Sequence, residues 1–398
     1  MTMMSIESTH ADHGATFATR GDRTVVSHYG RPERAHRAVR NGVGLIERVV
    51  GVVSVRGDDR IDYVDNVLSN RVPSSEGEGC YALLLDPQGG IETDLYVYNA
   101  GERVLCFTPP GRAEALADEW AEKVFIQDVE IDDVTDDLAI FGVHGPQATE
   151  KVASVLHGSA TPDEPLTFVR GSIADAGVSV IRTDAPTGEE GYEIICDVTD
   201  APAVFEALSV QGMNAAPFGY QTWGSLTLEA GTPLFEHELA GTIPNVLGLR
   251  NALDFAKGCY VGQEVVSRVE NRGQPSRRLI GLTLGTDGDT GEADDTTAVS
   301  DSTETAETGD GTAESADAAD QTAEPGAAVF DGDSVVGEVT RSMTSPTLET
   351  PIALALVDFD LDASSLTVRV DGEALPATAT ELPFVDGSER SARLPSYP

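Results

Sequence analysis

Lysine is nearly absent from this 398-residue chain, which contains only Lys123, Lys151 and Lys257. Its 26 basic residues are therefore mostly arginine, and 67 Asp and Glu outnumber them to give a formal net charge of −41. A surface this acidic repels nucleic acid and anionic membranes at ordinary salt, so we expect neither as a direct partner. The composition favours a halophilic setting, a high-salt cytoplasm in which counter-ions screen the self-repulsion.

Cysteine is also scarce. Four cysteines, Cys80, Cys106, Cys196 and Cys259, lie far apart without a Cys-x-x-Cys pair, which excludes a recognisable disulfide framework or zinc spacing. The first three lie in apolar, strand-like runs and are expected in the core. The seven histidines show no metal-ligand spacing beyond one weak pair near the N-terminus, so no metal site is predicted.

Long apolar runs and common catalytic motifs are missing too. No segment approaches the roughly 20 apolar residues of a membrane span, and residues 1–23 lack the apolar region of a signal peptide. The sequence has no P-loop, no Gly-x-Gly-x-x-Gly after a strand and no Gly-x-Ser-x-Gly elbow. We therefore expect a soluble, cytoplasmic protein outside those nucleotide-binding and hydrolase classes.

The length and a hydrophobic content of 40% allow two or three domains with sizeable cores. Residues 1–27 are polar and are predicted to form a flexible tail. Residues 28–276 contain two stretches with a similar order of strands and helices, the first of which includes a hairpin over 81–98. This order predicts two pseudo-symmetric α+β lobes with a ligand cavity between them.

The C-terminal part has a different amino-acid composition. Residues 285–325 contain 13 acidic residues, no Lys or Arg and almost no large apolar side chain, so this segment is predicted to be a disordered acidic insert. Short strands separated by Gly, Pro and Asp turns follow in residues 326–398. Together with a strand over 277–284 they predict a small β-barrel that carries the insert in one loop.

The most distinctive stretch is Lys257-Gly-Cys-Tyr-Val-Gly-Gln-Glu264, which brings a cation, a thiol, a phenol and a carboxylate together around two glycines. The nearby Lys257 and backbone N–H groups could lower the pKa of the Cys259 thiol and provide a reactive thiolate. Alternatively, Cys259 is a small buried apolar residue in a glycine-rich loop. The pattern alone leaves both interpretations open.

Two carboxylates are candidates for ligand binding. Asp94 lies in the second strand of the hairpin, and strand alternation puts it on the same face as Glu92, an arrangement that is usually a solvated face. Glu193 follows the glycine turn of Thr187–Ile194. A carboxylate there could accept two adjacent N–H groups in bidentate fashion, or could simply be exposed.

These stretches resemble the YgfZ-type folate-binding proteins, which are relatives of the glycine cleavage T-proteins (GcvT, aminomethyltransferases). Lys257–Glu264 is similar to the YgfZ signature, and Gly89–Leu95 and Thr187–Ile194 resemble folate-binding segments of T-proteins. The resemblance covers about residues 28–284 and 326–372. It implies an α+β fold in which two pseudo-symmetric lobes surround a folate cavity, with a small C-terminal β-barrel.

The same resemblance implies roles for individual residues. Asp94 would orient tetrahydrofolate and stabilise charge as its amine attacks, Tyr81 would line the pocket, and Glu193 would pair with the pterin ring.

The remaining candidates belong to the signature stretch and the residues after it. Lys257 and Arg268 are expected to help bind the folate, although Arg268 could equally form a structural ion pair. Cys259 would be the functional thiol.

Two departures separate this chain from T-proteins. Pro186 replaces a tyrosine before the Thr-Gly-Glu run, and Trp223 and Thr227 stand at two arginine positions of the T-protein helix. A pocket without those groups could hold folate differently or lack the aminomethyl chemistry.

Three functions follow from these observations. The first is a tetrahydrofolate-binding YgfZ-type protein that supports assembly or repair of iron–sulfur enzymes and, through them, tRNA modification. The second is an aminomethyltransferase that moves the aminomethyl carbon from a lipoyl carrier protein to tetrahydrofolate and releases ammonia. The third is a non-catalytic acidic scaffold that uses residues 285–325 to bind partners.

Overall fold

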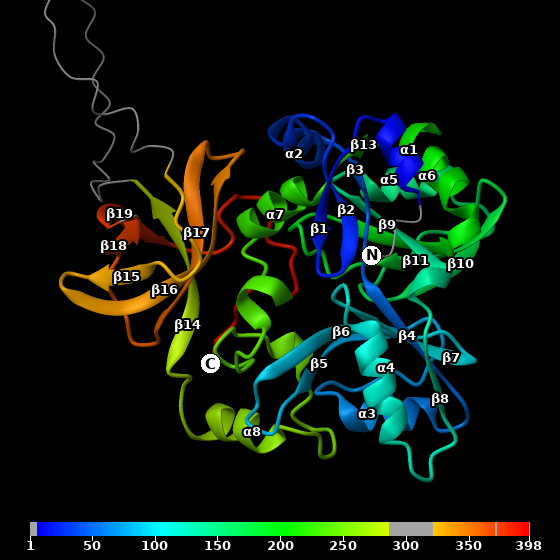
Figure 1. The fold of residues 1–398 in the computed structure, drawn as a ribbon, viewed down its shortest axis with the longest axis horizontal. Coiled ribbons are helices and arrows are strands. Elements are labelled where there is room, and N and C mark those ends of the chain that lie inside the picture. The colour runs from blue at the N-terminus through cyan, green and yellow to red at the C-terminus, as the bar shows by residue number, and fades with distance from the viewer. Residues whose placement is uncertain (1–5, 286–320, 371, 398) are drawn as a thin grey trace, which may run out of the picture.

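A computed structural model describes residues 6–285, 321–370 and 372–397 of the chain. It contains two α+β lobes and a closed C-terminal β-barrel, as Figure 1 shows. The predicted fold class, two lobes plus a small barrel, is confirmed.

The first lobe is an antiparallel sheet in the order β5-β6-β7-β4-β8, covered by two helices. Its apolar core includes the inward side chains of the strands and the buried Trp120. The elements are β4 (Gly51–Arg56), α3 (Arg60–Val67), β5 (Gly79–Leu85), β6 (Ile91–Asn99), β7 (Arg103–Thr108), α4 (Ala113–Glu122) and β8 (Glu130–Asp133).

The predicted hairpin of the first lobe is present as β5 and β6. Asp86 explains its turn, because its side chain accepts hydrogen bonds from the amides of Gln88 and Gly90 at 2.7 and 2.9 Å. Gly89 adopts a φ of +83°, a conformation that side chains disfavour. The turn fixes the register that places Tyr81 opposite Tyr96 and Leu83 opposite Asp94.

The second lobe has the strand order β10-β11-β12-β9-β3-β13. Apolar residues of the strands and of helices α5 and α6 form its core. The elements are α2 (Pro32–Asn41), β3 (Gly44–Glu47), η1 (Thr135–Asp137), β9 (Leu138–His144), α5 (Ala148–Val155), β10 (Phe168–Ile173), β11 (Ala176–Arg182), β12 (Gly191–Asp197), η2 (Val198–Asp200), α6 (Ala201–Val210), β13 (Ala216–Pro217) and α7 (Tyr220–Glu229).

The chain crosses between the lobes twice. Strand β3 belongs to the sheet of the second lobe, whereas β4, which begins four residues later, belongs to the first. The chain returns to the second lobe through η1. The first crossing, Arg48–Val50, therefore lies at the junction of the two sheets.

Residues 6–27 do not form the predicted flexible tail. They fold into α1 (Glu7–Asp12) and the hairpin of β1 (Thr16–Arg20) and β2 (Arg23–His28). His10 is fully buried and hydrogen-bonds to Glu47 and to the hydroxyl of Tyr29, each at 2.6 Å. Polar composition suggested a tail, but these polar side chains find partners inside the second lobe, which removes the cost of burying them.

The barrel closes in the order β14-β17-β16-β15-β18-β19 around an apolar core. Residues 286–320, most of the predicted acidic insert, lie outside the described residues, and they fall in the connection between β14 and β15. The strands are β14 (Arg277–Leu284), β15 (Ala328–Asp331), β16 (Ser334–Ser345), β17 (Thr350–Asp358), β18 (Ser365–Val370) and β19 (Glu373–Thr380).

The residues after β19 leave the barrel, although the prediction assigned them to it. Figure 1 shows this C-terminal segment running back beside α7 between the barrel and the lobes. Its backbone bonds to the second lobe and to the connection between α7 and β14: the Ala392 amide donates to the carbonyl of Asp184 at 3.0 Å, and the Ser396 amide donates to that of Gly248 at 3.0 Å. Between α7 and β14 lie η3 (Phe235–Leu239), η4 (Arg250–Ala252) and α8 (Gln263–Arg272).

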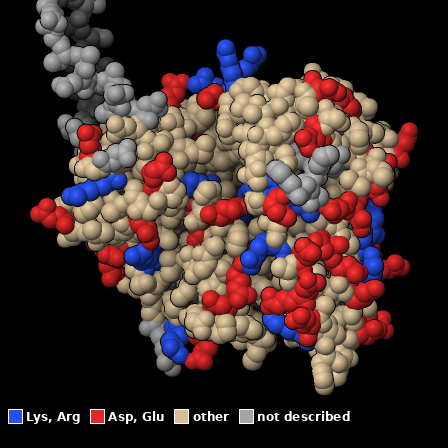
Figure 2. Space-filling view, viewed as in Figure 1, with Lys and Arg blue, Asp and Glu red and all other residues tan. Residues whose placement is uncertain are grey.

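The face drawn in Figure 2 carries acidic side chains over both lobes and the barrel, with basic side chains between them. This distribution agrees with the negative net charge of the chain. None of the described helices is both long and apolar enough to cross a membrane.

Glu229, at the end of α7, joins the second lobe to the barrel. Its carboxylate is fully buried and accepts hydrogen bonds from His36 at 2.9 Å, Arg40 at 3.1 Å and Ser345 at 2.5 Å. Burial alone would raise the pKa of Glu229, but the bonds and charges of His36 and Arg40 outweigh burial and lower it to about 2.

We expect Glu229→Gln to lower the free energy of unfolding at pH 7 by about 3 to 5 kcal/mol, because it leaves His36 and Arg40 without their anionic partner. The folded-state pKa of Glu229 lies below its ordinary 4.5, so its contribution is complete above that pH and is lost as the pH falls toward 2. Denaturant titrations at pH 7 and between pH 4.5 and 3 measure this.

The exposed Glu33 on α2 provides the control substitution, Glu33→Gln. A stability difference between wild type and Glu229→Gln that stays constant over the acid range would contradict the charge-based explanation.

Candidate functional site

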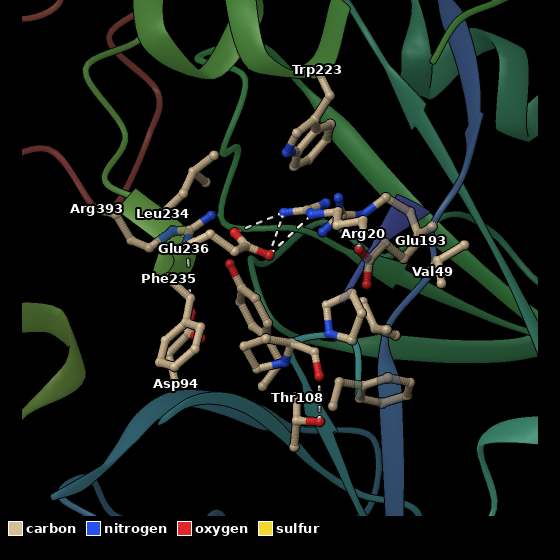
Figure 3. A pocket seen from close by; sticks show the side chains of 16 residues that line it. Arg20, Val49, Asp94, Thr108, Glu193, Trp223, Leu234, Phe235, Glu236 and Arg393 are labelled. Carbon is tan, nitrogen blue, oxygen red and sulfur yellow. Dashed lines mark hydrogen bonds and ion pairs between the residues drawn. The ribbon is translucent and has the colours of Figure 1, made fainter. Parts of the chain in front are cut away.

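A cavity lies where the two lobes, the N-terminal hairpin and the C-terminal segment meet (Figure 3). Its wall thus comes from segments that are far apart in the sequence. The lining residues are Arg20, Arg48, Val49, Val50, Asp94, Tyr96, Phe107, Thr108, Pro109, Pro110, Glu193, Trp223, Leu234, Phe235, Glu236 and Arg393.

Asp94 on β6 lies at the edge of this cavity and is 8% exposed. It accepts a hydrogen bond from the hydroxyl of Tyr81, on the paired strand β5, at 2.9 Å. Burial raises the pKa of Asp94, and the Arg393 charge and the Tyr81 hydrogen bond oppose that rise. The hairpin therefore brings the two predicted residues Tyr81 and Asp94 together, and burial, which outweighs the Tyr81 hydrogen bond, makes Asp94 a stronger base than an exposed aspartate.

Arg393 in the C-terminal segment is the main residue that sequence reasoning missed. Its guanidinium lies 4.0 Å from the carboxylate of Asp94 and 3.3 Å from that of Asp184, and it stacks over the rings of Tyr81 and Tyr96 at 5.2 and 5.7 Å. Tyr96 donates to Asp184 at 2.8 Å. A single buried arginine thus joins a carboxylate of each lobe.

Only a weak signal marked this residue. Arg390 and Arg393 are the only basic residues after Arg369. Neither lies in a periodic pattern, so no local signal indicated that the segment returns to the lobes.

Glu193 on β12 lies on the second-lobe side of the cavity, as its predicted ligand role requires. Its carboxylate is 3.3 Å from Nε of Arg48 in the lobe crossing. The Arg48 guanidinium stacks on the ring of Trp223, 3.8 Å from its centre. Asp94 and Glu193 therefore line the same cavity together with Arg48, which the sequence did not indicate, whereas Tyr81 is buried behind Asp94 and does not line the cavity as expected.

Trp223 and Thr227 on α7 stand at positions where the resembling sequences have arginine, and arginines from other elements lie beside both. Arg48 stacks on Trp223, and Arg341 of β16 donates to the hydroxyl of Thr227 at 3.0 Å. Arg341 is also 3.4 Å from Glu238 in η3. Positive charge is thus present near both positions, although it comes from the lobe crossing and the barrel.

The N-terminal hairpin adds a further charged pair to the cavity. Arg20 donates to both carboxylate oxygens of Glu236, at 3.0 and 2.9 Å, and stacks over Tyr220 at 4.4 Å. Figure 3 shows this ion pair below Trp223. The segment predicted as a tail therefore contributes directly to the site.

Lys257 does not line the cavity. Its ammonium donates to the backbone carbonyls of Asp65, Leu68 and Asn70 at 2.5, 2.9 and 2.9 Å, and it lies 3.4 Å from the Asp65 carboxylate. It therefore satisfies carbonyls at the C-terminal end of α3, where a cation is favourable. This structural role does not support the predicted contact with folate.

Cys259 and Arg268 are likewise outside the cavity lining. Cys259 is exposed in the loop before α8. Arg268 lies on α8 and pairs with Glu264 one turn away at 2.5 Å, with 59% of its side chain exposed. Of the two roles expected for Arg268, folate binding or a structural ion pair, this contact corresponds to the ion pair. The stretch Lys257–Glu264 therefore forms a surface loop, and its lysine caps the C-terminal end of α3. None of its residues lines the cavity.

The other three cysteines are buried, which confirms their assignment to the core. Burial raises the pKa of Cys80 and that of Cys196 to about 12. Within the described ranges, no group of three or more His, Cys, Asp or Glu side chains is arranged to hold a metal ion.

Two protein-family models match this chain. The model of the GCVT N-terminal domain matches residues 6–257, and that of the glycine cleavage T-protein C-terminal barrel domain matches residues 314–386. Two similar proteins are the aminomethyltransferases of Corynebacterium aurimucosum, 29% identical with 94% of this chain and 96% of the relative covered, and of Cutibacterium acnes, 30% identical with 95% and 97% covered.

A solved structure shares the fold. The glycine cleavage system aminomethyltransferase T from Bartonella henselae superposes with a TM-score of 0.79 at 20% identity, covering 97% of this chain and 98% of that one.

We expect one thiol per folded chain to react with a maleimide or a disulfide reagent, because only Cys259 is exposed. The reaction of Cys80, Cys106 and Cys196 should require denaturant. Mass spectrometry of peptides labelled before and after unfolding identifies each site, and Cys259→Ser is the control. Rapid labelling of a second cysteine in the folded chain would refute this assignment.

Proposed function

The chain belongs to the glycine cleavage T-protein family, and from this premise we propose that it binds tetrahydrofolate in the cavity and acts as an aminomethyltransferase. The observation that carries the proposal is the buried Asp94 carboxylate, held by Tyr81 at the edge of a cavity that also contains Glu193. The names of the relatives favour this function over the YgfZ-type one.

The residues of the cavity fit a folate. A pterin is a flat ring whose 2-amino-4-oxo edge offers adjacent N–H donors, which suit the carboxylate of Glu193. Aromatic side chains of Phe107, Trp223 and Phe235 line the same space and suit the faces of flat rings.

Asp94 is the residue of this chain that would take part in transfer. Two amine nitrogens of tetrahydrofolate would each form a bond to the aminomethyl carbon carried by the lipoyl group of a partner protein, and this carbon becomes a methylene bridge between them. Its bonds to nitrogen and to sulfur break, so ammonia and the lipoyl thiol leave with the two protons that the folate amines lose. The Asp94 carboxylate would accept a hydrogen bond from the reacting nitrogen and stabilise the positive charge that develops there. Its raised pKa makes it the better acceptor of that proton.

We expect Asp94→Asn to lower the rate of tetrahydrofolate-dependent ammonia release from an aminomethyl-lipoyl carrier by about 100-fold or more, because the amide cannot take the proton. Binding of tetrahydrofolate should change much less, since Glu193 and the aromatic lining of the cavity remain. A single-turnover ammonia assay and calorimetry measure the two effects.

Glu92→Gln, on the same strand but exposed, is the matched control. Equal losses of rate in both variants would contradict the role of Asp94. Absence of tetrahydrofolate binding to the wild-type chain would refute the proposal as a whole; Trp223 in the cavity wall gives a fluorescence signal for this test.

One observation favours the YgfZ-type function as a second candidate. Cys259 is exposed within the stretch Lys257–Glu264, so a partner protein can reach its thiol without entering the cavity. In this alternative the thiol would act in the assembly or repair of iron–sulfur enzymes, with folate bound separately.

Under this alternative, Cys259→Ala should abolish rescue of iron–sulfur enzyme activity in a strain that lacks the protein. Val261→Ala, an exposed change in the same loop, should rescue normally. Full rescue by Cys259→Ala would rule out a role for the thiol.

The acidic-scaffold hypothesis depends on residues 285–325, most of which lie outside the described residues, and no observation favours it. Cytoplasmic location and adaptation to high salt stay predictions from composition.

A further inference from the structure

Arg48 occupies an unusual place in the cavity wall. Its guanidinium lies between the ring of Trp223, 3.8 Å away, and the carboxylate of Glu193, 3.3 Å from Nε. Its side chain is 13% exposed. Stacking on an aromatic ring fixes the plane of the guanidinium, so its remaining donors have a defined direction.

The donors that Arg48 has left are the important feature. Only Nε is used in its contact with Glu193, and within the described part of the chain the two Nη nitrogens make no hydrogen bond. These nitrogens are not among the buried polar atoms without a partner, so each is at least partly exposed, and Arg48 lines the cavity. The wall therefore presents a carboxylate, which accepts, next to a guanidinium, which donates.

The residues behind Trp223 hold this arrangement in place. His144 is fully buried and packs edge-to-face on Trp223, with ring centres 5.2 Å apart. Burial and the nearby Arg48 lower the pKa of His144 to about 3, so the imidazole is neutral at physiological pH and does not repel the guanidinium strongly. His144, Trp223 and Arg48 form a stack that ends at the cavity.

We infer that Arg48 determines ligand specificity by donating to the 4-oxo group of the pterin ring while Glu193 accepts from the adjacent N–H groups. This inference rests on the proposed folate binding. The edge of a pterin has the order 2-amino donor, N3–H donor and O4 acceptor, which complements a carboxylate followed by a guanidinium. The cavity then selects 2-amino-4-oxo pterins against their 4-amino analogues.

The chemical reason is the reversed polarity at one atom. A 4-amino pterin places an N–H donor where the 4-oxo acceptor stood, so it would oppose the N–H groups of Arg48 and leave them unpaired. Such an analogue also lacks the N3–H that Glu193 accepts. The contribution of Arg48 must therefore be separated from that of Glu193, which a cycle of two ligands and two proteins does.

The experiment measures dissociation constants of tetrahydrofolate and tetrahydroaminopterin, its 4-amino analogue, by calorimetry on the full chain and on Arg48→Met. Methionine keeps an extended side chain on Trp223 but removes all donors. We expect Arg48→Met to raise the dissociation constant of tetrahydrofolate by about 10- to 100-fold and to change that of tetrahydroaminopterin by less than about threefold.

Arg369→Met is the matched control, since Arg369 also stacks on an aromatic ring, that of Phe330 in the barrel at 4.8 Å, and it is exposed. It should leave both dissociation constants unchanged. Arg48→Lys, which keeps the charge but not the planar fork, should recover only part of the preference.

The outcomes separate the two proposals. If Arg48→Met raises both dissociation constants by the same factor, the preference for tetrahydrofolate over its 4-amino analogue is unchanged. That result would overturn the proposed role of Arg48, while the proposed folate binding would stand. If neither ligand binds the wild-type chain, the proposed function fails first. Should Arg48→Met not fold, Arg48→Gln gives the same comparison with one donor group retained.

Discussion

Buried carboxylates need cations or hydrogen-bond donors, and this constraint organises the structure. The chain has few basic residues, yet four buried acids have an arginine nearby: Glu229 has Arg40, Glu238 has Arg341, and Asp94 shares Arg393 with Asp184. The half-buried Glu193 has Arg48. Arginine suits these places because its charge persists on burial and its planar fork satisfies several acceptors. The joints between lobes, barrel and termini are therefore ionic as well as apolar.

Two of the three lysines donate hydrogen bonds mainly to backbone carbonyls, whereas the arginines above pair with carboxylates. Lys257 donates to carbonyls at the end of α3, and the buried Lys151 donates to the carbonyls of Ala207 and Gln211 at the end of α6, at 3.2 and 2.6 Å. A lysine ammonium has three donors in a compact group, which suits several converging carbonyls. The contacts of Lys257 thus give this part of the stretch Lys257–Glu264 a stabilising role that does not involve folate.

The same ionic joints assemble the cavity. The N-terminal hairpin is held over it by the pair of Arg20 and Glu236, and the C-terminal segment by Arg393. Asp94 and Glu193 come from different sheets, which the lobe crossing at Arg48 joins. A ligand in this cavity would contact both lobes and both terminal segments at once, so binding would stabilise their arrangement.

The sequence by itself determined the local elements of the site. Turn residues and strand alternation predicted the hairpin that carries Asp94 and Tyr81, the glycine turn before Glu193, and a barrel after residue 276, because these depend on short-range backbone preferences. Only the tertiary structure decided that residues 6–27 fold, that Arg48 and Arg393 enter the cavity, and that Lys257 and Arg268 do not. Except for the pairing of Arg268 with Glu264 one turn away, those outcomes depend on contacts between residues far apart in the sequence, as much as 299 residues for Asp94 and Arg393, and no local pattern indicates them.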